Sequence, residues 1–194
     1  MKKLFTALVA LVLSLSVSAQ FYIYCSNGNV LEVDSISLVK PDNSNNHEDN
    51  SNNHEYVDLG LPSGLKWATC NVGATTPEEY GYYFAWGETQ PKKNYDWTTY
   101  KYGTNYDQLT KYCNNSYWGK DGFTDNKTVL DPEDDAATMN WGGAWRMPTI
   151  AEQQELLSNC TWTWTTQNGV NGYKVTGPNG NSIFLPIAGY MLRG

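Results

Sequence analysis

Residues 130–157, LDPEDDAATMNWGGAWRMPTIAEQQELL, carry the strongest local structural signals in the chain. Thr149 is followed three residues later by Glu152, which is the pattern of a capping box: the threonine oxygen accepts from the N3 amide and the glutamate reaches back to the N-cap amide. Pro148 favours the end of an extended segment just before it. We therefore predict a helix over about 149–158, with an apolar side formed by Ile150, Leu156 and Leu157.

Trp141 and Trp145 are separated by two glycines and an alanine. This spacing indicates large rings that lie against a closely approaching backbone. We expect Arg146 to pair with an internal acid such as Asp134 or Asp135 rather than with a substrate. The stretch is thus predicted to be scaffold, with any ligand bound by the loops around it.

The acidic turn at 131–135 allows two interpretations. Carboxylates of Asp131, Glu133 and Asp135 could bind calcium, although the spacing is not that of an EF-hand. Alternatively, Asp131 caps a short helix over 132–139, with the following acids in its favourable first turn. The cap is preferred, so no cofactor is expected and calcium is kept as the alternative.

Residues 1–19 have the organisation of an export signal. Lys2 and Lys3 precede an apolar run over 4–13, and Val17-Ser18-Ala19 is a small-residue cleavage site. The run is shorter than the roughly 20 residues of a spanning helix. The prediction is an exported protein, extracellular, at the cell surface or periplasmic, without a transmembrane segment.

The chain is acidic, with a formal net charge of -7. Removal of the signal with its two lysines makes this charge more negative still. Such a protein repels nucleic acid unless it carries a basic patch, and its lysines and arginines are scattered along the sequence. No nucleic-acid partner is expected.

Two segments separate the signal from the main domain. Residues 20–40 are predicted to form a β-hairpin leader around Asn27-Gly28, the strongest short hairpin signal. Residues 41–55 contain the heptad DNSNNHE twice, without an apolar residue to bury. This favours a disordered linker, with a weak metal-binding tract at His47 and His54 as the alternative.

The domain at 56–194 is predicted to be α+β, with short strands, one clear helix and long loops. Early strands are expected over 56–59, 65–72 and 82–86. A late three-strand meander is expected over 162–164, 173–176 and 182–187, with both indoles of its first strand on one face. The long insertion at 87–128 has little periodicity, which is typical of functional or poorly ordered loops.

The four cysteines, in an exported chain, indicate disulfides with three possible pairings. Their spacing is unlike a CxxC zinc or redox motif. One bridge inside the domain, among Cys70, Cys113 and Cys160, with two free thiols is as consistent with the sequence as two bridges that include Cys25.

Residues 56–194 contain no histidine. Nucleophilic hydrolysis usually needs a histidine base, so we expect no enzyme. The insertion instead interleaves aromatic rings with amides, hydroxyls and carboxylates, as glycan sites and antibody paratopes do. The candidate ligand-binding residues are Trp97, Tyr100, Tyr102, Tyr106 and Trp118.

Five ordered segments resemble the Fibrobacter succinogenes major paralogous domain family of secreted Bacteroidetes proteins: VDLGLPSGLKWATCNVGA (57–74), YGYYFAWGET (80–89), DNKTVLDPEDDAA (125–137), WGGAWRMPT (141–149) and NGYKVTGPNGNSIFLPIAGY (171–190). The resemblance implies a C-type lectin-like fold, related to formylglycine-generating enzymes, with twisted antiparallel sheets. Within it, the family-motif scaffold residues are Trp67, Trp86, Asp134, Asp135, Trp141, Gly142, Trp145, Arg146 and Pro148.

Members of that family continue past the equivalent of Gly189-Tyr190 into a final strand, whereas this sequence stops at Gly194. The resemblance therefore implies an incomplete sheet, from a truncated gene or completed by a partner strand. The leading hypothesis is a secreted or cell-surface, non-catalytic module that binds glycan or protein. The alternatives are a truncated or degenerate relative of the formylglycine-generating enzymes and a structural surface-assembly component completed by a partner.

Overall fold

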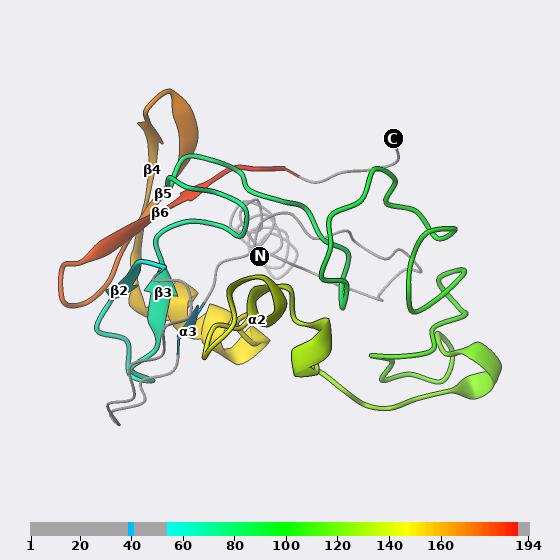
Figure 1. Cartoon of the computed structure of the whole chain (residues 1–194). Helices are drawn as coiled ribbons and strands as arrows, with labels where there is room; N and C mark the ends of the chain where they lie inside the picture. Colours follow the sequence, from blue (N-terminus) through cyan, green and yellow to red (C-terminus); the bar gives the residue numbers. More distant parts are fainter. Residues whose placement is uncertain (1–38, 41–53, 190–194) are drawn as a thin grey trace, which may run out of the picture.

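The computed structural model describes residues 39–40 and 54–189 (Figure 1). The export signal, the leader up to residue 38, the linker over 41–53 and the last five residues lie outside this range. The predictions made for them therefore stay predictions. Within the described residues, no helix has both the length and the apolar character needed to cross a membrane.

The first sheet joins three short antiparallel strands in the order β1-β3-β2. They are β1 (Val39–Lys40), β2 (Tyr56–Asp58) and β3 (Lys66–Ala68). A turn joins β2 to β3, in which Gly64 N donates to Leu61 O over 2.9 Å. Strand β3 is shorter than the predicted 65–72.

The segment at 82–86 does not form the predicted strand, apart from a single bridge residue at Phe84, and the prediction was wrong for the rest of it. Its backbone makes different hydrogen bonds: Tyr82 N donates to Val72 O over 2.8 Å, and Tyr83 O accepts from the Tyr95 hydroxyl. Gly81 just before it has φ +74°, a left-handed conformation that interrupts an extended strand. The aromatic and apolar residues of this segment therefore enter the core from a loop.

The second sheet is the predicted meander, in the order β4-β5-β6. It consists of β4 (Thr161–Gln167), β5 (Val170–Thr176) and β6 (Ser182–Pro186). The β4–β5 turn is Asn168-Gly169, with φ +48° and +85°, as a type I′ hairpin turn requires. Figure 1 shows this hairpin projecting from the body of the molecule.

The predicted capping box is confirmed at the start of α3 (Ile150–Asn159). Glu152 N donates to Thr149 Oγ1 over 3.3 Å, and Thr149 N donates to Glu152 Oε2 over 2.7 Å. The predicted apolar side is only partly correct. Leu156 is fully buried, but the other buried position is Gln153, whereas Ile150 is 64% exposed.

A shorter helix, α2 (Ala136–Trp141), precedes α3, and two 3-10 turns, η2 (Lys120–Gly122) and η3 (Pro132–Asp134), lie before it. The prediction that Asp131 caps this region was wrong, because its side chain makes no cap hydrogen bond. Asp135 caps α2 instead, accepting from Ala137 N and Thr138 N. The helix expected over 132–139 is therefore divided into η3 and α2, which are separated at Asp135, a residue with extended backbone.

Apolar side chains gather in two clusters. The first core cluster joins α2 and the Trp-Gly-Gly segment to Phe84 from the loop that follows Gly81. It also includes Trp141, Trp145 and Met147. The second core cluster joins both sheets to α3, and includes Leu59, Trp67, Leu156 and Val175. The domain is thus α+β, with two small antiparallel sheets and one clear helix.

Replacing Thr149 with alanine should lower the free energy of unfolding by about 1 kcal/mol, because the N3 amide loses its acceptor at the helix start. Urea denaturation measures this effect. Ser158→Ala, at an exposed position in the last turn of α3, is the matched control and should change stability by less than about 0.5 kcal/mol. Equal effects of the two substitutions would contradict a stabilising role for the capping box.

Candidate functional site

The insertion at 87–128 is an ordered loop that occupies the end of the molecule away from the sheets (Figure 1). Main-chain hydrogen bonds close it on itself: Leu109 N donates to Trp118 O over 3.0 Å, Lys120 N to Leu109 O over 2.9 Å, and Thr110 N to Tyr102 O over 2.8 Å. The insertion is therefore not the poorly ordered loop that its length and lack of periodicity allowed.

Asp134, at the end of η3, anchors the insertion. One carboxylate oxygen accepts from Lys101 Nζ at 2.9 Å and Tyr102 Oη at 2.5 Å. The other accepts from Lys111 Nζ at 2.5 Å and Tyr112 Oη at 2.8 Å. These five residues, which we name the Asp134 cluster, join the insertion to the helical turn before α2.

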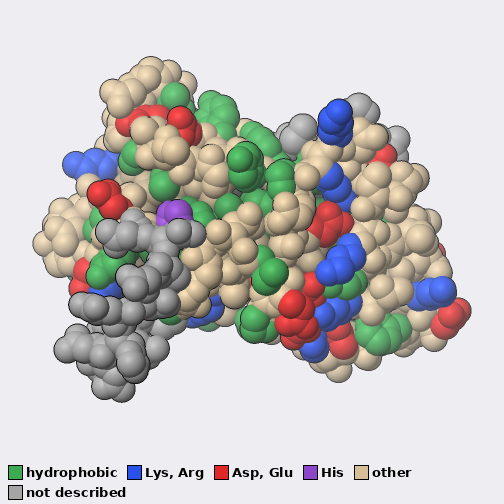
Figure 2. All heavy atoms as spheres, in the orientation of Figure 1, with side chains coloured by type: hydrophobic (Ala, Val, Ile, Leu, Met, Phe, Trp, Pro, Cys, Tyr) green, Lys and Arg blue, Asp and Glu red, His purple; other side chains and the backbone are tan. Residues whose placement is uncertain are grey.

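Only 1% of the Asp134 side chain is exposed, compared with 22% for Lys111 and 53% for Lys101. A buried carboxylate without partners would be very costly. Here the two ammonium groups compensate its charge, and they also lie over the tyrosine rings, with Lys101 Nζ 4.7 Å from the Tyr102 centroid. Figure 2 shows charged side chains gathered where the insertion meets the rest of this face.

The titration behaviour of the cluster follows from these contacts. Burial opposes ionisation of Asp134, but hydrogen bonds from Lys111, Tyr102, Lys101 and Tyr112 outweigh it and hold the pKa of this carboxyl well below its usual range. Hydrogen bonds to acids raise the pKa of Lys111, and burial raises the pKa of Tyr112 to about 12. Near neutral pH the lysines stay charged and the phenols stay protonated, so none of these groups is suited to act as a base or nucleophile.

Two further carboxylates order the insertion by accepting from its main chain. Asp125 accepts from Tyr112 N at 2.8 Å, Cys113 N at 2.9 Å and Lys127 N at 3.1 Å. Glu88 accepts from Lys101 N at 2.8 Å. The loop is thus held from inside by acids whose hydrogen-bonding capacity is already used.

The five predicted ligand-binding aromatics fall into two groups rather than one. Trp97, Tyr100 and Tyr102 form an edge-to-face series, with centroids 5.9 and 6.2 Å apart. Tyr106 and Trp118 form a separate pair at 5.8 Å. All five are half-buried, and Tyr102 is committed to Asp134.

The second group includes a residue that the sequence analysis did not single out. Tyr117 packs edge-to-face on Trp118, with centroids 4.6 Å apart, and is 67% exposed. We name Tyr106, Tyr117 and Trp118 the loop aromatic cluster. Asn115 fixes its turn, because its side-chain oxygen accepts from Tyr117 N at 2.9 Å.

The family-motif residues lie in the scaffold. Trp67, Trp141, Trp145 and Pro148 are buried, and Trp86 packs against the first core cluster. Gly142 ends α2 with φ +70°, a conformation that favours glycine. Asp135, besides capping α2, accepts from Met147 N at 2.9 Å, and burial raises the pKa of its carboxyl.

The prediction that Arg146 pairs with Asp134 or Asp135 was wrong. Its guanidinium forms a bidentate pair with Glu152 at 2.9 and 2.6 Å, because Asp134 is enclosed by the lysines of the insertion and Asp135 accepts from main-chain amides. The same Glu152 closes the capping box, so Arg146 fixes the start of α3 to the chain before it.

His54, which the sequence analysis assigned to the linker, packs on the domain. Its ring stacks on Trp141 with centroids 3.8 Å apart and 14° between the planes, and lies edge-on to Trp145 at 6.3 Å. Its Nε2 is buried, with no hydrogen-bond partner among the described residues. His54 thus contacts the domain that the sequence analysis placed at 56–194.

Cys70, Cys113 and Cys160 are free thiols, so the disulfide expected inside the domain is not formed among them. They lie in different surroundings: Cys70 packs against the first core cluster and Cys160 against the second. Burial raises the pKa of both thiols, which disfavours the reactive thiolate. Cys25 lies outside the described residues.

Two of the three residues proposed for calcium make other contacts. Asp131 pairs with Lys111 and Lys127, each at 2.6 Å, and Asp135 accepts from amides. Across residues 39–40 and 54–189, no three His, Cys, Asp or Glu side chains are grouped so that they could hold a metal ion.

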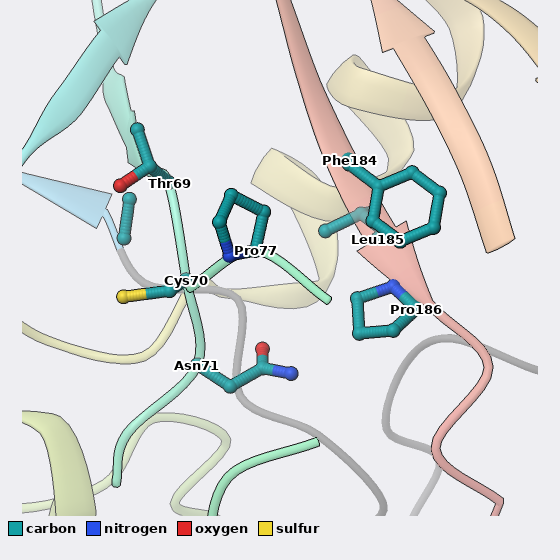
Figure 3. A pocket seen from close by; sticks show the side chains of 8 residues that line it. Thr69, Cys70, Asn71, Pro77, Phe184, Leu185 and Pro186 are labelled. Carbon is teal, nitrogen blue, oxygen red and sulfur yellow. The ribbon is translucent and has the colours of Figure 1, made fainter. Parts of the chain in front are cut away.

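A shallow recess, partly open to solvent and without room for a water molecule, lies between β6 and the chain that follows β3 (Figure 3). Cys70, Pro77 and Phe184 are among the residues that line it. The Cys70 sulfur points away from Phe184 in this view, so the recess does not combine a thiol with a binding cavity.

The sequence analysis missed Lys101, Lys111 and Tyr112. One signal was present: the dipeptide Lys-Tyr occurs at 101–102 and again at 111–112, within an otherwise acidic chain. Their common partner, Asp134, lies more than twenty residues further along, so the sequence contained no local sign of the contact.

Comparison with known proteins adds no relative to this picture. No protein-family model, curated protein or solved structure matches the chain.

Asp134→Asn should lower the free energy of unfolding by about 3 kcal/mol, because it removes a buried charge and leaves two ammonium groups without it. Asp131→Asn, at a more exposed carboxylate that also contacts Lys111, is the control and should lower the free energy of unfolding much less, because solvent screens its ion pairs. Urea denaturation of both variants measures the difference. Similar small losses would mean that Asp134 is not the main anchor of the insertion.

Stability should also depend on His54 through pH. Burial lowers the pKa of this imidazole from its ordinary value of 6.5, so the folded state favours the neutral ring and loses stability as pH falls below that value. His54→Phe keeps a ring on Trp141 but cannot be protonated. This variant should therefore lose less stability than the unaltered protein between about pH 7 and pH 5.5. Urea denaturation at both pH values is the measurement, with His47→Phe, the equivalent residue of the first heptad, as the control.

Proposed function

We propose that the protein is an exported, non-catalytic recognition module whose ligand, a glycan or a protein, binds the loop aromatic cluster. The observation that carries this proposal is Tyr117, a ring that is 67% exposed yet fixed against Trp118. Tyrosine and tryptophan at a binding surface provide a large contact area for little loss of side-chain entropy.

The rigidity of the insertion supports the proposal. The main-chain hydrogen bonds at Leu109 lie directly beside Trp118, and the Asp134 cluster connects the loop to η3. A binding surface that is ordered before the ligand arrives loses less conformational entropy on binding. Because the anchoring acids already have partners, the aromatic and amide groups are left as the chemistry that a ligand would contact.

The surroundings of the cluster favour a glycan over a protein. Asn114, Asn115 and Ser116 are exposed beside Tyr117, and amides and hydroxyls beside a ring match the hydroxyls and C–H faces of a sugar. A C-type lectin-like fold of the Fibrobacter succinogenes major paralogous domain type is part of this proposal. The two small antiparallel sheets, the single clear helix and the long ordered loops are compatible with it.

The other two hypotheses have less support. A relative of the formylglycine-generating enzymes would need neighbouring cysteines, and Cys70 and Cys160 pack against different core clusters. A surface-assembly component completed by a partner strand would depend on the chain after Gly189, which is outside the described residues. Neither hypothesis explains why Tyr117 of the loop aromatic cluster is exposed.

A glycan array tests the proposed function. Tyr117→Ala and Trp118→Ala should each weaken binding of the retained glycan by about tenfold, or about 1.4 kcal/mol. Tyr80→Ala, at an exposed tyrosine outside the insertion, is the matched control and should bind as the unaltered protein does. The proposal fails if the unaltered protein binds neither glycans nor surface proteins, or if all three variants bind equally.

A further inference from the structure

The β4–β5 hairpin carries aromatic side chains on one face, well apart from the insertion. Trp164 lies opposite Tyr173 in the register, and Trp162 lies opposite Val175, so all four share a face. Toward the body of the protein this face is core, because Val175 is fully buried. Toward the turn it emerges into solvent, and Trp164 is 53% exposed.

The exposed indole is held in place by its neighbours. Tyr173 lies between the two tryptophans, with its centroid 5.8 Å from Trp162 and 5.1 Å from Trp164, and both pairs are edge-to-face. Trp162 is attached to the body through its Nε1, which donates to Leu156 O over 3.4 Å. Trp164 therefore projects from an aromatic series that begins at the second core cluster.

The hairpin that presents Trp164 is fixed at its turn. Gln167 Nε2 and Asn168 Nδ2 both donate to Glu78 Oε1, over 2.6 and 2.7 Å. Thr166 Oγ1 donates to Asn171 Oδ1 over 2.7 Å across the two strands. A hairpin held at its turn by these contacts, and at its base by Trp162, presents its side chains in one arrangement, which lowers the entropy lost on binding.

The chemistry of this face fits a neutral, hydroxyl-rich ligand. Its exposed members are Trp164, Thr166 and Asn171, none of them charged, in a chain whose formal net charge is -7. Lys174, the charged residue of β5, is on the opposite face by alternation. Within the described residues, the Trp164 indole N–H has no hydrogen-bond acceptor, so it can donate to a ligand.

A protein partner would need a larger apolar area than one indole bordered by a hydroxyl and an amide. A charged partner would find no complementary charge on this face. A pyranose ring, in contrast, stacks its C–H face on an indole and uses its hydroxyls with the amide, hydroxyl and N–H groups at the edge.

We propose that Trp164, with Thr166 and Asn171, forms a second saccharide-binding surface on the β4–β5 hairpin that takes neutral oligosaccharides. The inference rests on the proposed recognition function, and it narrows the ligand class from glycan or protein to an uncharged glycan. In Figure 1 the hairpin and the insertion lie at different ends of the molecule, so one saccharide unit cannot contact both surfaces.

Titration calorimetry with neutral hexasaccharides of glucan, xylan, mannan and chitin type tests this inference. For a hexasaccharide that binds, Trp164→Ala should weaken the hairpin site by about tenfold, and Trp164→Phe should weaken it less. Thr163→Ala, at an exposed position on the opposite face of β4, is the matched control and should bind as the unaltered protein does. Urea denaturation of each variant shows that the loss is not one of folding.

A direct readout is the indole N–H resonance of Trp164 in ¹⁵N-labelled protein, assigned by its disappearance in Trp164→Phe. This resonance should shift when the hexasaccharide is added. It should shift in the Trp118→Ala variant as well, in which the loop aromatic cluster is altered. If binding is lost in Trp118→Ala and unchanged in Trp164→Ala, the hairpin surface is refuted and the loop aromatic cluster stands. If no hexasaccharide binds the unaltered protein, the hairpin surface is refuted, while charged glycans or proteins can still bind the loop.

Discussion

The buried carboxylate of Asp134 is the contact on which the order of the insertion depends. A long loop with few strands has little regular hydrogen bonding to oppose its conformational entropy. Four donors from two separate parts of the insertion, Lys101-Tyr102 and Lys111-Tyr112, meet at this single acid. Because leaving a buried charge without partners costs several kcal/mol, each of these contacts favours the same loop conformation, and the loop aromatic cluster is presented as a consequence.

The adjacent acid has a different task, although the two residues have identical side chains. Asp135 faces the interior and accepts only from main-chain amides, at the start of α2 and at Met147. Burial raises the pKa of its carboxyl, whereas the lysines and tyrosines around Asp134 lower the pKa there. Asp135 therefore joins α2 to the chain at Met147, and Asp134 joins η3, just before α2, to the insertion. Both proposed binding surfaces lie outside this framework, on the insertion and on the hairpin, where rings can be exposed without weakening the core.

The sequence predicted elements whose determinants are close together in the chain. The capping box at Thr149 and Glu152, the three-strand meander predicted over 162–164, 173–176 and 182–187, and the shared face of Trp162 and Trp164 are confirmed, although the first two strands are longer than predicted. Each follows from residues that are close together in the chain. The errors have a common cause. The segment at 82–86 has strand-like composition, but its hydrogen bonds go to Val72 and Tyr95. Arg146 was expected beside Asp134 or Asp135, but Glu152 is closer once α3 has formed and both aspartates have other donors.

By itself, the sequence determined the α+β class, the capped helix, the late meander and the acidic composition, since these depend on local pattern and composition. The tertiary structure alone decided that scattered lysines gather around Asp134, that His54 stacks on Trp141, and that the predicted loop aromatics divide into two groups. These contacts join residues far apart in the chain, and they exist only because the buried acids and the two core clusters bring those segments together. A sequence pattern reports which side chains share a local face, whereas the packing of distant segments decides which of them remain available to a ligand.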